Sequence, residues 1–321
     1  MIRRGLLLLV TALGGATNAV AQTYPDKPIR IISPFSPGGG TDLMGRLIGQ
    51  QLTKSWGQQV IVENRPGANG MLGSEFVAKS APDGYTLLIG TMGTHGINAS
   101  LYRKMPYDAV NDFTPVTALI TSPMLLLVHP SIPARSVRDY IALARAKPAQ
   151  ITFSSAGTGS VGHLAGELFN YIAQVRIVHV PYRGSGPATI DLLSGQVQSM
   201  IGSPAATLHY VKAGRVRALA QTSLKRSSLI PDVPTLAESG LKDYDVTTWY
   251  GVWAPARLPN TIAQKLHAEV VRMLALPETR QLLMSQGMEP LGNTSDEFAA
   301  QIKTELAKWA RVAANAAITP E

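Results

Sequence analysis

Short β-rich runs alternate with segments of helical periodicity along almost the whole chain. Strand-like runs occupy residues 29–32, 60–62 and 85–89, and residues 43–52 between the first two repeat apolar side chains at helical spacing. Strands that alternate with helices form parallel sheets covered by helices on both faces. The alternation therefore predicts the α/β fold class.

The same pattern continues through the second half of the chain. Further helices are predicted at 136–146, 161–173, 204–213, 260–274, 279–286 and 296–314. Further strands are predicted at 151–153, 177–180 and 216–220.

Two apolar extended stretches suggest where the chain passes between lobes. Residues 125–128 lie between Pro123 and Pro130, and residues 246–253 end just before Pro255. If both stretches cross, the first lobe combines residues 24–123 with 248–321. The second lobe then covers residues 124–247.

The N-terminus has the features of an export signal. Arg3 and Arg4 precede a short apolar run at 5–13, and Ala19-Val20-Ala21 offers a small-x-small cleavage site. The run is too short to cross a bilayer core of ~30 Å, so residues 1–21 are predicted to be a secretory signal peptide rather than an anchor. No later stretch approaches a membrane span, and we expect a periplasmic protein that does not itself cross the membrane.

Composition excludes several classes of protein. With 45% hydrophobic and 16% charged residues the chain can bury a core, and the absence of cysteine excludes disulfides and thiolate metal sites. The formal net charge is +8, but basic residues occur only in scattered pairs such as Arg103-Lys104. This scatter argues against a nucleic-acid partner and favours either a weak attraction for small anions or simple solubility.

Three loops place glycine and hydroxyl residues where a predicted strand ends and a helix begins. They are residues 34–42, 154–160 and 181–187. Ligands of open α/β sheets bind at this end of the strands, and helix N-termini there offer unpaired N–H groups to an anion. Three such loops predict a cleft for a carboxylate or phosphate.

The second loop also fits a dinucleotide-binding pattern, with glycines at 157, 159 and 162. That pattern requires an acidic residue at the end of the next strand, which here ends in Tyr182 and Arg183. None of the three loops contains the lysine of a Walker motif. We therefore expect no nucleotide or nicotinamide cofactor, and the six histidines show no metal-ligand spacing.

A hydrolase remains the alternative at this stage. No serine has glycine at both −2 and +2, so the nucleophile elbow is absent. His95 follows a strand and His163 opens a helix, and either is a candidate general base or a hydrogen-bonding residue of the cleft. Asp42 is expected to cap its helix or to contact a ligand amine, and Arg183 to pair with an acidic ligand or with another residue.

Several motifs together resemble a known family. The segment Pro34-Phe35-Ser36-Pro37-Gly38-Gly39-x-x-Asp42 is similar to the opening signature of the Bug family, the TctC-like solute receptors of tripartite tricarboxylate transporters. The likeness continues, in order, through residues 62–70, 82–88, 112–116, 163–169, 180–184 and 248–255.

The resemblance implies a two-lobed, type II-like Venus-flytrap binding protein in which each lobe is a mostly parallel sheet flanked by helices. Such a protein has no catalytic activity; it closes around a small carboxylate and delivers it to membrane permease subunits. The alternative hypothesis is that the protein binds the same ligand but presents it to a signalling partner rather than to a permease. In this family loop amides, hydroxyls and bridging waters hold the carboxylate, which agrees with the uncharged loops above.

The resemblance also implies the residues that bind the ligand. Those of the first lobe are Phe35, Gly38, Gly39, Thr41, Thr91, Thr94 and His95. Those of the second lobe are Ser155, Thr158, Gly159, Ser160, His163, Tyr182, Arg183, Gly184 and Ser203.

One segment departs from the family pattern. After Gly195 the family usually has an Asp and then an aromatic residue near the strand end, whereas residues 196–203 here read Gln-Val-Gln-Ser-Met-Ile-Gly-Ser. The missing acid and the smaller side chain are expected to enlarge the pocket or to remove a contact to a ligand amine. The departure argues against an amino acid ligand.

Overall fold

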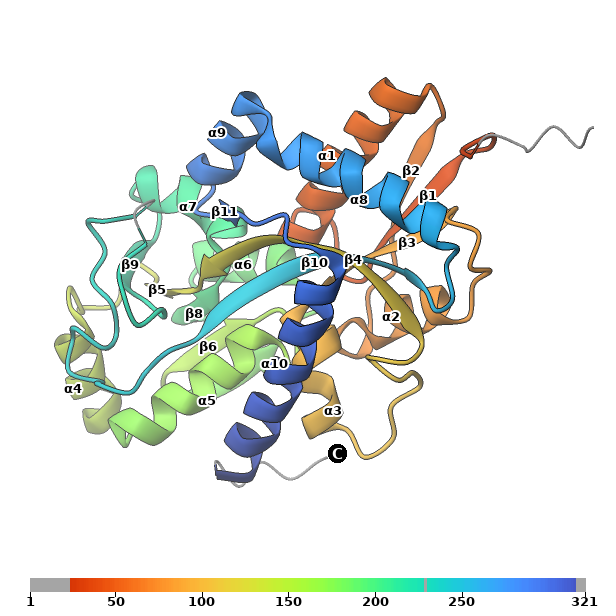
Figure 1. The fold of residues 1–321 in the computed structure, drawn as a ribbon. Coiled ribbons are helices and arrows are strands. Elements are labelled where there is room, and N and C mark those ends of the chain that lie inside the picture. The colour runs from red at the N-terminus through yellow and green to blue at the C-terminus, as the bar shows by residue number, and fades with distance from the viewer. Residues whose placement is uncertain (1–23, 228–229, 316–321) are drawn as a thin grey trace, which may run out of the picture.

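The computed structural model describes residues 24–227 and 230–315, so the predicted signal peptide lies outside the described residues. Two sheets lie side by side in separate lobes, and long strands run from one lobe toward the other (Figure 1).

The first sheet has six strands in the order β11-β4-β10-β3-β1-β2. Strands β1, β2 and β3 are parallel, while β10 is antiparallel to both of its neighbours and β11 is antiparallel to β4. The bounds are β1 Ile29–Ser33, β2 Val60–Asn64, β3 Thr86–Thr91, β4 Phe113–Pro123, β10 Thr247–Pro255 and β11 Glu289–Pro290.

The second sheet has five strands in the order β7-β6-β8-β5-β9. Strands β6, β7 and β8 are parallel, and β5 is antiparallel to both of its neighbours. The bounds are β5 Leu125–Val128, β6 Thr152–Ser155, β7 Val178–Pro181, β8 Ser199–Gly202 and β9 Arg217–Gln221.

Helices flank both sheets (Figure 1). The lobe of the first sheet contains α1 Gly40–Trp56, α2 Met71–Ala78, α3 Asn98–Leu101, α8 Asn260–Ala275, α9 Pro277–Ser285 and α10 Ser295–Asn315, with the short turns η1 Ala68–Gly70 and η2 Gly93–Ile97. The lobe of the second contains α4 Val137–Ala146, α5 Val161–Ala173, α6 Ser185–Leu193 and α7 Pro204–Lys212.

These elements confirm the two-lobed α/β class. Each sheet is mixed: three adjacent parallel strands are followed by antiparallel pairings, which β10 makes in the first sheet and β5 in the second. Strand β10 pairs with β4 from Thr247 opposite Pro123 to Pro255 opposite Phe113. Strand β4 passes through Met124 directly into β5, so the two sheets share a continuous connection.

Amphipathic packing explains why these segments fold as they do. In α1, Met44, Ile48 and Leu52 are fully buried against Ile29 and Ile31 of β1. Each buried aliphatic side chain contributes roughly 1.5–3 kcal/mol relative to an exposed one. This face of α1 therefore fixes the position of the helix N-terminus at the end of β1.

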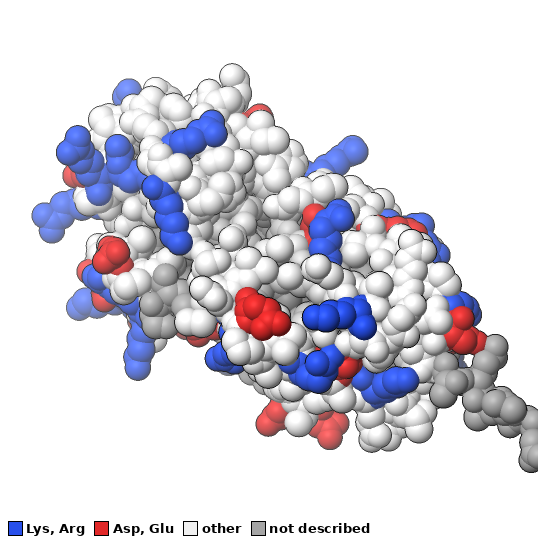
Figure 2. All heavy atoms as spheres, turned by 90° about the horizontal axis from the view of Figure 1, so that it is seen from above, with Lys and Arg blue, Asp and Glu red and all other residues white. Residues whose placement is uncertain are grey.

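None of the helices in 24–227 and 230–315 is long and apolar enough to span a bilayer. Figure 2 shows Lys and Arg side chains spread over one face, interspersed with acidic ones and separated by broad uncharged areas.

Candidate ligand-binding site

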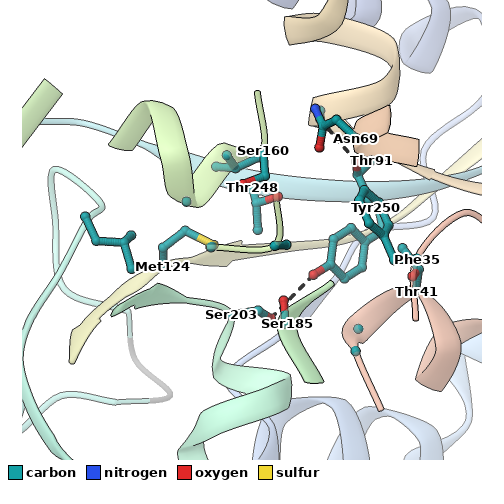
Figure 3. A pocket seen from close by; sticks show the side chains of 17 residues that line it. Phe35, Thr41, Asn69, Thr91, Met124, Ser160, Ser185, Ser203, Thr248 and Tyr250 are labelled. Atoms are coloured by element: carbon teal, nitrogen blue, oxygen red, sulfur yellow. Dashed lines mark hydrogen bonds between the residues drawn. The ribbon is translucent and has the colours of Figure 1, made fainter. Parts of the chain in front are cut away.

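Four helices begin at one cavity between the two lobes. The cavity has about 550 Å³ of space not filled by atoms, including the open solvent at its mouth. The first residues of α1, α5 and α6 and Ser203, the N-cap residue of α7, lie in its wall (Figure 3). N–H groups in the first turn of a helix have no intrahelical acceptor, and this end of the helix has a partial positive charge. The arrangement therefore favours an anionic ligand group.

This inner cavity is lined by small, hydroxyl and apolar residues. They are Phe35, Gly39, Gly40, Thr41, Asn69, Thr91, Gly93, Met124, Ala156, Ser160, Val161, Gly162, Ser185, Ile201, Ser203, Thr248 and Tyr250. None of these lining residues is charged. Backbone N–H groups and hydroxyls are thus the groups available to hold an anion here.

The segments that connect the lobes form part of the cavity wall. Met124 lies between β4 and β5, where its N–H donates to Thr222 Oγ1 at 2.8 Å. Thr248 and Tyr250 lie two residues apart on β10 and both line the cavity. Side chains two residues apart on a strand point to the same face of the sheet, so β10 presents both groups to the ligand space.

A hydroxyl contact crosses the cavity. The phenol of Tyr250 donates to Ser203 Oγ at 3.4 Å, joining β10 to the start of α7 (Figure 3). Burial raises the pKa of Tyr250, so its hydroxyl remains a neutral donor.

Hydrogen bonds hold the loop before α5 in shape. Ser155 Oγ lies 2.7 Å from His179 Nε2 and accepts from the N–H of Gly157 at 3.1 Å. His163 Nδ1 accepts from the N–H of Gly159 at 3.0 Å, and the His163 and His179 rings stack with centroids 4.0 Å apart. Burial lowers the pKa of His163 to about 4, so the ring is neutral at physiological pH.

His95 lies in an aromatic cluster outside the cavity lining. Its ring is fully buried, stacks on Trp253 at a centroid distance of 4.0 Å, and has its Nδ1 2.8 Å from Thr94 Oγ1. Burial lowers its pKa to about 3. A ring without access to the ligand space does not support a hydrolase mechanism.

Asp42 supports the first turn of α1. Its Oδ2 accepts from the N–H of Gly38 at 3.2 Å, and Arg46 binds both carboxylate oxygens at 3.0 Å. The carboxylate thus stabilises the helix start, which is one of the two roles expected from the sequence, and it is not part of the cavity lining.

A second, outer cavity adjoins the first and shares Phe35, Asn69 and Ala156 with it. It has about 560 Å³ of unfilled space, and Arg183 is the one charged residue that lines it. The Arg183 side chain is exposed and has no ion-pair partner within the part of the chain that the structure describes. A ligand that extends from the uncharged inner cavity into the outer cavity can therefore contact one positively charged side chain, that of Arg183.

The structure distributes the predicted site residues over three places. The inner cavity contains Phe35, Gly39, Thr41, Thr91, Ser160 and Ser203. The outer cavity contains Phe35, Thr158, Tyr182 and Arg183. Outside both linings lie Gly38, Thr94, His95, Ser155, Gly159, His163 and Gly184.

Several lining residues were not among those predicted, notably Asn69, Met124, Ser185, Thr248 and Tyr250. Asn69 belongs to the family-like segment 62–70, and Ser185 follows Gly184 in the third loop, so both had a sequence signal. Thr248 and Tyr250 belong to the family-like segment 248–255 and had the same kind of signal. Met124 had none, because it reaches the cavity only through its place between β4 and β5.

Two sheets joined by crossing strands, with an uncharged cavity between them at several helix N-termini, define a two-lobed solute receptor. The family model "Tripartite tricarboxylate transporter family receptor" matches residues 44–318. The chain belongs to this family, which confirms the resemblance to Bug and TctC-like receptors, and members of the family are periplasmic receptors.

Known relatives match along nearly their whole length. BugT of Bordetella pertussis is 36% identical over 306 residues, covering 95% of this chain and 94% of BugT. An R. palustris protein solved with adipate is 37% identical with a TM-score of 0.90, covering 93% of this chain and all of that one. MatC from Rhodopseudomonas palustris with bound malate is 34% identical with a TM-score of 0.86, covering 90% of this chain and 99% of that one.

Proposed function

We propose that this protein captures a small carboxylate-bearing organic acid in the inner cavity and delivers it to permease subunits of a tripartite tricarboxylate-type transporter. The observation that supports this most strongly is the meeting of four helix starts at a cavity whose lining residues are uncharged.

The electrostatics of the cavity select the charge of the ligand. Each helix N-terminus is equivalent to roughly half a positive charge, so several of them together can balance one carboxylate. No Asp or Glu is among the lining residues to balance a buried ammonium. The preferred ligand group is therefore an anion.

The related proteins bind ligands of this kind. Two that share more than a third of their residues with this chain were solved with adipate and with malate, both of them dicarboxylates. The exposed Arg183 of the outer cavity is suitably charged for a second carboxylate.

We place the lobe boundaries at the crossing strands. The first lobe then comprises residues 24–123 and 248–321, and the second comprises residues 124–247. The division of strands between the two sheets supports these limits. Export by a signal peptide of residues 1–21 would bring the mature protein to the periplasm.

A thermal-shift screen of the purified mature protein tests this proposal. Di-, tri-, hydroxy and aromatic acids are each added in large excess, because a ligand at 100 times its Kd stabilises the folded state by about 2.7 kcal/mol. We expect at least one acid to raise the Tm and to bind with 1:1 stoichiometry in calorimetry. If no acid in the panel shifts the Tm, the proposal is wrong.

The same samples test the alternative of a secreted hydrolase. We propose that the protein only binds its ligand, since His95 and His163 lie outside both cavity linings. Mass spectra of each acid, and of its methyl ester, should be unchanged after long incubation. Turnover that is lost in His163→Ala would instead support catalysis.

A further inference from the structure

Asn69 is the one polar residue among the three that line both the inner and the outer cavity. It lies in η1, between β2 and α2. Only 8% of the residue is exposed, and its backbone is left-handed, with φ 48° and ψ 41°. Asn is one of the few residues besides Gly that tolerate this conformation.

A second asparagine fixes which way the Asn69 amide faces. Asn98 Nδ2 donates to the carbonyl oxygen of Asn69 at 3.3 Å, which leaves Asn98 Oδ1 to accept from Asn69 Nδ2 at 2.5 Å. Turning either amide around would bring two acceptors or two donors together. The orientation of the Asn69 side chain is therefore set by its partner.

This orientation leaves one buried acceptor unpaired. Asn69 Oδ1 has no hydrogen-bond partner among the residues that the structure describes. In Figure 3 the amide oxygen is turned toward the interior of the cavity and the nitrogen away from it. A buried acceptor without a partner carries an unfavourable desolvation penalty, which a donor on the ligand removes.

The ligand group that can pair with Asn69 Oδ1 follows from its chemistry. A carboxylate oxygen is itself an acceptor and is repelled, whereas hydroxyl and ammonium groups both donate. An ammonium would be buried without a carboxylate beside it, because no lining residue of the inner cavity is acidic. A hydroxyl avoids this cost.

We propose that the ligand is a hydroxy acid whose hydroxyl donates to Asn69 Oδ1, and that Asn69 selects it over the analogue without the hydroxyl. This inference rests on the proposed function, because the carboxylate of the same ligand binds at the helix N-termini. Sites that pair with a substrate hydroxyl reject the deoxy analogue strongly, since the analogue leaves the buried group unpaired.

Calorimetry with matched acid pairs tests the inference. The pairs are malate with succinate, 3-hydroxybutyrate with butyrate, and mandelate with phenylacetate. In each pair with a measurable Kd, we expect the hydroxy acid to bind the wild-type protein at least tenfold more tightly.

The variant Asn69→Gly removes the acceptor and keeps a residue suited to the left-handed backbone. It should weaken the hydroxy acid at least tenfold and change the deoxy analogue less than threefold. Ser74→Ala is the matched control, because it removes a buried hydroxyl of α2 that lies outside both cavity linings. The preference should be unchanged in this control.

If the glycine variant does not fold, Asn69→Asp provides a second test of the same contact. Its carboxylate still accepts a hydrogen bond but repels the anionic ligand, so both members of a pair should weaken while the preference remains. Equal affinities within every pair, or an unchanged preference in Asn69→Gly, overturn the inference and leave carboxylate binding intact. A protein that binds none of the six acids and shows no shift in the wider thermal screen overturns both.

Discussion

The carbonyl oxygen of Arg183 accepts hydrogen bonds from both the N–H and the hydroxyl of Ser36, at 3.2 and 2.5 Å. Ser36 belongs to the loop before α1 and Arg183 to the loop before α6, so these bonds join the two lobes. A second contact, from the Tyr102 hydroxyl to the Thr158 carbonyl at 3.3 Å, also joins them. The lobes are therefore in direct contact in this structure, a closed arrangement in which main-chain carbonyl oxygens accept these bonds.

Closure leaves no room for a side chain at Gly186. A Cβ atom there would lie 2.7 Å from the carbonyl oxygen of Pro37, and backbone cannot move aside as a flexible side chain can. We predict that Gly186→Ala lowers ligand affinity at least tenfold, because apparent affinity falls with the fraction of molecules able to close. The Tm without ligand should be unchanged or slightly higher, since Ala favours the helix.

Gly96→Ala is the matched control for that substitution. The nearest atoms to a Cβ at this position are 3.5 Å away, an ordinary contact distance. Calorimetry should give wild-type affinity for this control. Wild-type affinity in Gly186→Ala would show that closure does not require the contact between these two loops.

Arg183 is predicted to distinguish dicarboxylates from monocarboxylates. Its exposed side chain lines only the outer cavity, where a second carboxylate would lie. Exposed ion pairs contribute roughly 0.2–1 kcal/mol, so Arg183→Ala should weaken adipate by a factor of about 1.4 to 5 and hexanoate by less. Paired titrations at low salt measure this difference, and an equal loss for both acids would contradict the assignment.

The stability of the protein is predicted to fall with pH below neutrality. The folded-state pKa of His163 is lowered to about 4, below its unfolded value of about 6.5. The unfolded state therefore binds more protons between these values, and folding becomes less favourable as pH falls through this window. The shift corresponds to a loss on the order of 2–3 kcal/mol at the acidic end.

Urea unfolding at pH 7.5, 6 and 5 measures this effect. His163→Asn keeps an acceptor for the N–H of Gly159 and removes the titrating ring, so its stability should decline less steeply with acid. The decline should not vanish, because burial, and then the neighbouring His163, lowers the pKa of His179 to about 3 in the wild type. Identical pH profiles for wild type and variant would refute the role of His163.

Local patterns predicted the fold well, whereas contacts between distant segments did not follow from them. The helix predicted at 161–173 is α5, because its apolar spacing and its Ser160 N-cap are local signals. The antiparallel pairing of β10 with β4 joins segments more than 120 residues apart, and no local pattern encodes its direction. The sequence therefore predicted mostly parallel sheets but not which strands, β5, β10 and β11, run antiparallel to their neighbours.

The candidate site divides in the same way. The three Gly- and Ser-rich loops were recognisable because the junction of a strand and a helix is a local feature. His95 also follows a strand, yet Trp253 of β10 stacks on its ring and holds it in the core. Met124 reaches the cavity only because it lies where β4 passes into β5.

The central claim is that main-chain amides at helix N-termini hold the carboxylate between the lobes. A crystal structure with the acid that gives the largest thermal shift tests it most directly. We predict carboxylate oxygens in the inner cavity, within about 3.2 Å of first-turn N–H groups of α1, α5 or α6. A carboxylate bound elsewhere, with no helix N-terminal amide within that distance, would contradict the claim.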